Sequence, residues 1–263
     1  MSELILDPSL MCELDTQDQK FLRTNQKNTI QISWAQDENE IREAQQLRYK
    51  VFAEEMGAHL ISNYEKIDKD ILDQYCDHLL IRDTETLKVI GTYRVLPPQK
   101  AKEAGFYYSD LEFHLDRLMH LSDKMVEVGR SCVHKDFRTG GVIMALWSGL
   151  ADYMKKNNYE VMIGCASVPM GDGGHYAASL AKKINALHLS PLEYRVTPKL
   201  PLPIHELDQD LNVEPPALLK GYLRLGAKVC GDPAWDPDFN TADFLTMFFL
   251  KDIPPRYAKH FLV

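Results

Sequence analysis

The feature that most constrains the fold is a charged strand that runs directly into a glycine turn and then into an apolar helix. The strand covers Lys124–Val133 and carries Glu127 and Arg130. The turn is Arg138–Gly141, and the apolar sequence Gly141–Asn157 has the length and content of a packed helix. Strands that lead directly into helices build layered domains in which helices cover a sheet.

Length and charge limit the classes of protein that this chain can belong to. With 263 residues it can bury one large core or two small ones, and its 45 % hydrophobic and 26 % charged content is ordinary for a globular protein. The net charge of −8 argues against broad nucleic-acid binding, which relies on basic surface. No nucleic-acid partner is therefore expected.

The cysteines and histidines indicate neither a disulfide framework nor a metal site. Five scattered cysteines include no Cys-x-x-Cys pair, and the histidines have no His-Glu-x-x-His spacing. The N-terminus lacks the pattern of a signal peptide, and apolar runs such as Phe244–Leu250 are too short to span a bilayer. We expect no metal and a reduced, cytoplasmic location.

The remaining patterns predict one α/β (α+β) domain with a mixed central sheet flanked by helices. Residues 1–29 are expected to form an arm, and residues 30–263 the domain, with a proline-rich insertion near 196–216. Predicted strands are Ile30–Trp34, Cys76–Arg82, Lys88–Leu96, Tyr159–Cys165, Lys228–Cys230 and Ala242–Leu250. Predicted helices are Glu40–Met56 with Asn39 as N-cap, Asp110–Leu118, His175–Leu187 and Ala217–Leu225.

Glu127 and Arg130 are three residues apart, so a regular strand would point them to opposite faces. Gly129 lies between them, and a glycine inside a strand often marks a bulge. A bulge would turn both charges toward one cleft and free backbone N–H groups for an oxyanion. The alternative is a structural pair that neighbouring strands satisfy, and the residues alone leave both open.

Two arginines occupy positions that a core normally reserves for apolar residues. Arg48 lies on the apolar face of its predicted helix, and Arg94 lies inside an apolar strand. A buried guanidinium needs a carboxylate partner. The loop between them offers Asp68, Asp70, Asp73 and Asp77. Such a network can hold a helix to a sheet, or hold the carboxylate and amine of a bound amino acid.

The turn Arg138, Thr139, Gly140 and Gly141 opens a helix, where free N–H groups and the helix dipole favour a phosphate. Cys132 on the preceding strand is a second candidate group. It could act as a nucleophile, but a small apolar strand residue is the commoner role and the one we favour.

The strand, turn and helix resemble the pantetheine-binding core of the GNAT-like acyltransferase superfamily. The usual pattern is Gln/Arg-x-x-Gly-x-Gly/Ala, and Arg138–Ile143 follows it except at the last small residue. A nearer resemblance is to acyl-homoserine-lactone synthases. Their Arg-x-x-x-Phe, Glu-x-x-Arg, strand arginine and paired aspartates correspond here to Arg48 and Phe52, Glu127 and Arg130, Arg94, and Asp73 and Asp77, although the family's first-loop tryptophan is absent.

Over roughly residues 40–260 the chain resembles the ornithine-lipid N-acyltransferases, long described as hemolysin-like. Seven blocks in the same order carry this resemblance: Leu47–Phe52, Cys76–Leu80, Gly91–Leu96, Gly129–His134, Leu146–Leu150, Leu218–Gly226 and Asp232–Asp236. It implies transfer of a 3-hydroxyacyl group from acyl carrier protein to the α-amine of L-ornithine, which gives lyso-ornithine lipid.

The resemblance also implies roles for the residues. Glu127 would accept a proton, with Arg130 beside it. Backbone N–H groups at Ser131, Cys132 and Val133 would stabilise the oxyanion. Arg48, Phe52, Asp73, Asp77 and Arg94 would form the amino-acid site, and Arg138–Gly141 would hold the phosphopantetheine of the carrier. No separate cofactor is expected.

An acidic carrier protein requires a local basic patch on this acidic chain. Candidates for that patch are Lys135, Arg138, Lys155, Lys156, Lys182 and Lys183. A lipid product predicts transient contact with the inner face of the membrane. Two other readings stay open. One is an N-acyl amino acid or acyl-homoserine-lactone synthase that uses another amine. The other is a non-catalytic protein of the same fold that binds acyl carrier protein or lipid.

Overall fold

A computed structural model describes residues 30–58, 60, 63–138, 140–255 and 257. Its main sheet has eight strands in the order β1-β2-β3-β5-β6-β10-β8, with β9 paired to β10. All pairs are antiparallel except β5 with β6, so the sheet is mixed, as predicted. The strands are β1 (Ile30–Trp34), β2 (Asp77–Asp83), β3 (Val89–Leu96), β5 (Met125–Val133), β6 (Val161–Pro169), β8 (Lys228–Val229), β9 (Ala234–Asp236) and β10 (Thr241–Phe249). The predicted arm lies outside the described residues.

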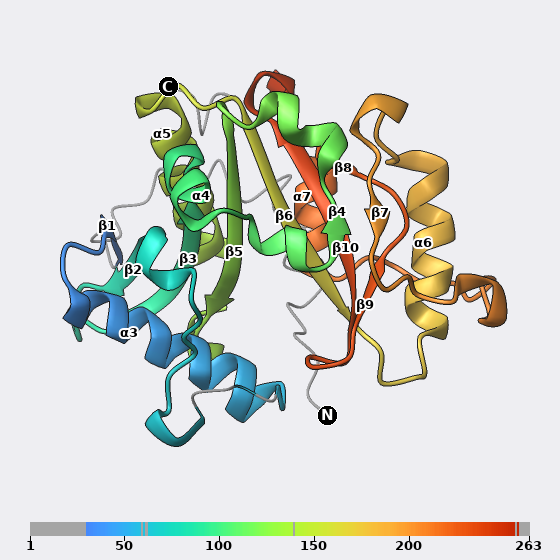
Figure 1. The fold of residues 1–263 in the computed structure, drawn as a ribbon. Helices are drawn as coiled ribbons and strands as arrows, with labels where there is room; N and C mark the ends of the chain where they lie inside the picture. Colours follow the sequence, from blue (N-terminus) through green and yellow to red (C-terminus); the bar gives the residue numbers. More distant parts are fainter. Residues whose placement is uncertain (1–29, 59, 61–62, 139, 256, 258–263) are drawn as a thin grey trace.

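Helices cover both faces of the sheet (Figure 1). They are α3 (Glu38–Tyr49), α4 (Pro98–Ala104), α5 (Gly140–Lys156), α6 (His175–Leu187) and α7 (Ala217–Arg224). Alternation along β5 separates the two faces, because Cys132 packs with α3 whereas Val133 packs with α5. Met125 and Ile163 face the side that carries α4 and residues 106–121. On the other side α6 and α7 pack on Ala166 and Phe244.

The helix predicted at Glu40–Met56 begins and ends differently. Asp37, rather than Asn39, is the N-cap, because its carboxylate accepts the backbone N–H groups of Asn39 and Glu40. The α-helical part ends at Tyr49, and the chain continues as a π-helix over Lys50–Glu55. Insertions of this kind often mark functional positions in helices.

The prediction of a helix at Asp110–Leu118 is wrong. Two 3₁₀ helices, Tyr108–Leu111 and Asp116–Leu121, flank the short strand β4 (Phe113–His114), which pairs with β7 (Thr197–Pro198). Phe113 is fully buried, so tertiary packing outweighs the local helical pattern there. The proline-rich segment 196–216 contains β7 and a 3₁₀ turn at Ile204–Glu206, and its Leu202 and Val213 pack against α6.

Candidate active site

The strands β5 and β6 pair over a short distance and then separate. Their parallel pairing joins Met125–Glu127 to Val161–Ile163. Gly164 follows, and a Cβ there would lie 2.3 Å from the carbonyl oxygen of Val128. Beyond this contact the described residues of the two strands form no further pairs, and the strands diverge toward the lower end of the view (Figure 1). The edge of β5 that faces β6 therefore keeps backbone groups outside the ladder, and a ligand can bind them.

Of the two alternatives that the sequence left open at Gly129, the structure contains the bulge. Two residues of β5, Arg130 and Ser131, stand opposite one residue of β3, Tyr93. Arg130 has a φ of 51°, which is the left-handed region that residues with a side chain rarely adopt. Such a conformation persists only where surrounding contacts hold it, and it concentrates at functional sites.

Arg48 is completely buried and bound to two aspartates. Its Nε lies 2.7 Å from Asp68 Oδ2, its Nη1 lies 2.7 Å from Asp73 Oδ1, and its Nη2 donates to the Asp68 carbonyl at 2.7 Å. Burial alone would raise the pKa of Asp73, but Arg48 and Arg94 outweigh it and hold that pKa below its usual range. The requirement for a carboxylate partner is thus met from the predicted acidic loop.

Arg94 and Arg130 join the same network. Arg94 Nη1 lies 2.6 Å from Asp70 Oδ1 and 3.3 Å from Asp73 Oδ2. Arg130 lies 3.3 Å from Asp68 and 3.2 Å from Asp70. Three arginines therefore balance three aspartates. Of the three arginine side chains, that of Arg130 is the most exposed, at 15 %.

Asp77 does not belong to this network, contrary to its predicted pairing with Asp73. It is exposed at the start of β2, and its carboxylate accepts the Tyr153 hydroxyl of α5 at 2.6 Å. The predicted spacing fails because Asp73 ends the loop in a 3₁₀ turn, whereas Asp77 already follows the alternation of a strand. Asp68 and Asp70 supply the remaining carboxylates of the network.

Glu127 is buried beside the bulge and anchors the segment that follows α4. Its Oε1 accepts the backbone N–H of Ser109 at 2.8 Å and the Ser109 hydroxyl, and its Oε2 accepts the N–H of Tyr108. Burial raises the pKa of Glu127, and these hydrogen bonds oppose the rise. Arg130 Cζ lies 5.0 Å from the centre of the Tyr108 ring. Both charges therefore meet one segment, as a bulge predicts.

The opposite wall of the separated strands carries acidic groups that the sequence patterns did not reveal. Glu112, Cys165 of β6 and Asp243 of β10 have side-chain donor or acceptor atoms within 4.8 Å of one another. Asp243 accepts the Thr241 hydroxyl at 2.8 Å and lies opposite Ser167 of β6. The site thus has a wall with cations on β3 and β5 and an acidic wall on β6 and β10.

The predicted phosphate-binding turn lies at the start of α5, which begins at Gly140. Arg138 forms an ion pair with Glu55 of the π-helix and donates from Nε to the Val133 carbonyl at 3.2 Å. Thr139 lies outside the described residues. The predicted phosphate-binding cation, Arg138, is therefore already paired with the carboxylate of Glu55.

The strand residues predicted for the oxyanion site have different surroundings. Ser131 lies beside the phenol of Tyr93, whose hydroxyl hydrogen-bonds with that of Tyr222. Cys132 packs with Phe52 and the end of α3, and burial raises the pKa of its thiol. This agrees with an apolar role for Cys132. Phe52 thus supports the strand from behind the bulge.

Comparison with known proteins places this geometry in a family. A profile described as acetyltransferase (GNAT) domain matches residues 47–148. The L-ornithine N(alpha)-acyltransferase of Agrobacterium fabrum is 35 % identical over 89 % of this chain and 85 % of its own length. The enzyme of that name from Rhodobacter capsulatus is 36 % identical over 88 % of this chain and 93 % of its own length. This chain belongs to the L-ornithine Nα-acyltransferase family.

Members of this family are acyltransferases, and the fold of this one is the GNAT fold. The structure of BjaI, a CoA-dependent acyl-homoserine lactone synthase with MTA, matches at a TM-score of 0.50 and 12 % identity, over 88 % of this chain and 89 % of that one. At this identity the likeness concerns the fold alone.

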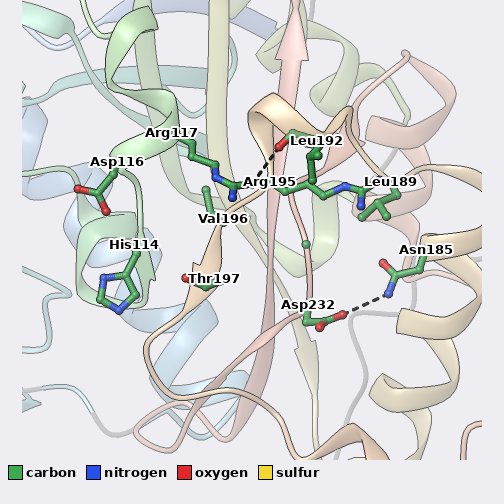
Figure 2. A pocket seen from close by; sticks show the side chains of 11 residues that line it. His114, Asp116, Arg117, Asn185, Leu189, Leu192, Arg195, Val196, Thr197 and Asp232 are labelled. Atoms are coloured by element: carbon green, nitrogen blue, oxygen red, sulfur yellow. Dashed lines mark hydrogen bonds between the residues drawn. The ribbon is translucent and has the colours of Figure 1, made fainter.

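A hollow of about 420 Å³ is lined by residues of the segments 114–117, 185–197 and 231–232 (Figure 2). Its polar groups are largely bound within the protein. Arg117 donates to the Leu192 carbonyl at 3.1 Å, and Asn185 donates to Asp232 at 3.2 Å. None of the residues predicted for the site lines it.

The six predicted basic residues do not form one patch. Lys182 and Lys183 lie on α6, where they pair with Asp210 and Glu214. The other four lie on or just before α5, at the opposite end of the sheet (Figure 1): Lys135, Arg138, Lys155 and Lys156.

None of the described helices is long and apolar enough to cross a membrane.

Proposed function

We propose that this protein transfers a 3-hydroxyacyl group from acyl carrier protein to the α-amine of L-ornithine, which gives lyso-ornithine lipid. The observation that carries the proposal is the separation of β5 from β6 directly beside the charged bulge at Arg130. Membership in a family whose members are named L-ornithine N(alpha)-acyltransferase supports the acceptor part of the proposal.

The donor would enter as the phosphopantetheine arm of the carrier, with no separate cofactor. The unpaired edge of β5 suits the amide groups of such an arm, because it offers backbone hydrogen bonds. The start of α5, with Arg138 before it, suits the phosphate. Arg138 would then share its guanidinium between Glu55 and the phosphate.

The acceptor would bind on the face of the sheet that carries Glu127. Arg130 is the best placed of the three arginines to meet the carboxylate of ornithine, because Arg48 is wholly buried and Arg94 is 5 % exposed. Arg48 and Arg94 would hold the loop of Asp68, Asp70 and Asp73 in place.

The reaction needs a neutral amine and a stabilised oxyanion. Glu127 would accept the ammonium proton, directly or through a water, since its Oε2 accepts one hydrogen bond and retains a lone pair. The amine nitrogen then attacks the thioester carbonyl carbon. Backbone N–H groups at Ser131–Val133 would stabilise the oxyanion. The C–N bond forms, the C–S bond breaks, and the carrier thiol leaves with a proton.

We further propose a cytoplasmic protein that contacts the inner face of the membrane transiently, because the product is amphiphilic. The test of the reaction is mass spectrometry of 3-hydroxyacyl-acyl carrier protein incubated with the protein and an equimolar amino-acid mixture. A product with the mass of acyl plus ornithine is expected. Acylation of another amino acid would show that ornithine is not the acceptor. Tight binding of the carrier without any product would show that the protein binds acyl carrier protein and does not catalyse the transfer.

A further inference from the structure

The acidic wall described above is built from residues far apart in the sequence. Glu112 follows the 3₁₀ helix Tyr108–Leu111, Cys165 lies on β6, and Asp243 lies on β10. Asp243 is 3 % exposed. No ion pair in the described part of the chain involves Glu112 or Asp243, so neither has a cationic partner among those residues.

The side-chain carboxyl group of Glu112 has no hydrogen bond within the described residues, although the backbone N–H and carbonyl of Glu112 are both bonded. Both of its carboxyl oxygens are shut off from solvent, and neither has a partner. Buried polar atoms in native proteins are nearly always satisfied, so two such atoms on one carboxyl group require an explanation. A donor that comes with a ligand would satisfy them.

On the opposite wall, the guanidinium of Arg130 also has a nitrogen without a hydrogen bond. Arg130 Nε is buried and makes no hydrogen bond, although it lies 3.3 Å from Asp68. The guanidinium lies over Tyr108 and also over Phe239, which precedes β10. Tyr108 is four residues before Glu112, so one short segment connects the cationic and acidic walls.

The charges of the two carboxyl groups depend on each other. Burial, followed by the charge of Asp243, raises the pKa of Glu112 to about 9, and burial raises the pKa of Asp243 to about 6. Two adjacent buried carboxyl groups do not both ionise, so near neutral pH the pair retains one proton in total and carries one negative charge. One negative charge matches one ammonium group.

We propose that Glu112 and Asp243 form a subsite for the side-chain ammonium of the acceptor, and that this subsite selects a diamino acid over a neutral amino acid. The inference rests on the proposed function and deepens it. Arg130 holds the carboxylate on the β5 wall, and the aliphatic chain crosses the gap past Tyr108. The distal ammonium donates to Glu112 and Asp243 on the far wall. The α-amine is then left between the walls, next to the separated strands.

The test compares ornithine with norvaline, which has the same carbon chain and no distal amine. Steady-state acyl transfer and calorimetric binding are measured for the wild-type protein, Glu112→Gln and Asp243→Asn. Asp210→Asn is the matched control, because Asp210 is an exposed carboxylate that pairs with Lys182 on the outside of α6. Thermal unfolding of each variant establishes that it is folded.

The proposal predicts that each site variant lowers kcat/KM for ornithine about 30-fold more than kcat/KM for norvaline, because the distal ammonium loses one of its two carboxyl acceptors while the remaining carboxyl keeps the single negative charge. The ornithine dissociation constant should rise by a similar factor, and the control should change neither. Equal losses for both amino acids, or unchanged discrimination, would overturn it. A second result would also overturn the proposal: the wild-type protein requires a divalent cation for activity, and both variants lose that requirement. The two carboxyl groups would then bind a metal ion and not an ammonium group.

The same experiment separates this proposal from the proposed function. Ornithine binding that depends on Glu112 and Asp243, without acyl transfer by the wild-type protein, would support the subsite and contradict the reaction. Acyl transfer to ornithine that both variants retain at the wild-type ratio to norvaline would support the reaction and contradict the subsite.

Discussion

Arg48 shows at the scale of a single residue how the acidic loop is fixed. Its guanidinium has no exposure and is bound by Asp68 and Asp73. Desolvation of such a group costs several kcal/mol unless its partners remain in place. The loop that carries these aspartates is therefore held against the sheet, and Asp70 is brought to Arg130.

Asp73→Asn tests this network. We expect a loss of about 3–5 kcal/mol in the free energy of unfolding, because Arg48 keeps its charge and loses a buried partner. Urea unfolding measures the loss. The matched control is Asp77→Asn, which removes an exposed carboxylate hydrogen-bonded to Tyr153 and should cost less than about 1 kcal/mol. Equal losses in the two variants would contradict the arrangement.

Glu112 gives a prediction about pH. Its folded pKa of about 9 lies above the ordinary 4.5, so the folded protein retains a proton that the unfolded chain releases between these values. Stability is therefore greatest below the lower value and falls as pH rises toward the higher one. Asp243, Cys165 and Asp236 face the same carboxyl group, and after burial the charge of Asp243 contributes most to raising the pKa of Glu112.

Glu112→Gln removes this titration. Between about pH 5 and about pH 8 we expect the urea midpoint of the variant to decline less than that of the wild-type protein. Asp210→Asn serves as the control and should follow the wild-type curve, because Asp210 is exposed. Parallel curves for all three proteins would show that Glu112 is not a buried, protonated carboxyl group.

The sequence was most informative where a charge interrupts an apolar pattern. Arg48 and Arg94 had to be paired, and the loop between them offered the carboxylates. Asp243 carries the same signal, an acidic residue beside the apolar run of β10. Its neighbour Glu112 is 131 residues away in the chain, and no periodic pattern links the two.

At the scale of elements the decisive feature is how β5 meets β6. The bulge could be predicted because Gly129 interrupts an alternating strand, although the left-handed residue proved to be Arg130. The separation of the strands could not be predicted, since it depends on Gly164 and Val128 in two different strands. The segment 108–121 was predicted wrongly because Phe113 is drawn into the core.

Gly164→Ala tests the meeting point of the strands. A Cβ would lie 2.3 Å from the Val128 carbonyl oxygen, so β5 or β6 must shift. We expect a loss of about 1–3 kcal/mol in stability together with a clear fall in acyl transfer. Gly171→Ala is the control, because no atom lies within 4 Å of its added Cβ. Full activity of Gly164→Ala would show that the separation tolerates movement.

At the scale of the whole molecule, the proposed acidic carrier would meet a protein of net charge −8, so its docking would need a local basic patch. Lys135 is exposed next to the turn proposed for the phosphate, whereas Lys182 is on α6 at the other end of the sheet. Lys135→Ala should lower kcat/KM for acyl-acyl carrier protein about 3-fold at low salt, and Lys182→Ala should not. The difference should disappear as salt increases and should be absent with an acyl-pantetheine donor. Equal effects of the two substitutions would show that the carrier does not dock beside Lys135.

The most direct test of the central claim is the position of the amide in the product. Ornithine labelled with ¹⁵N at either the α- or the δ-nitrogen is incubated with the protein and 3-hydroxyacyl-acyl carrier protein, and the product is fragmented by tandem mass spectrometry. The account predicts an amide on the α-nitrogen only, formed in equal amount with the free carrier thiol. An amide on the δ-nitrogen, or thiol release without any amide, would contradict it.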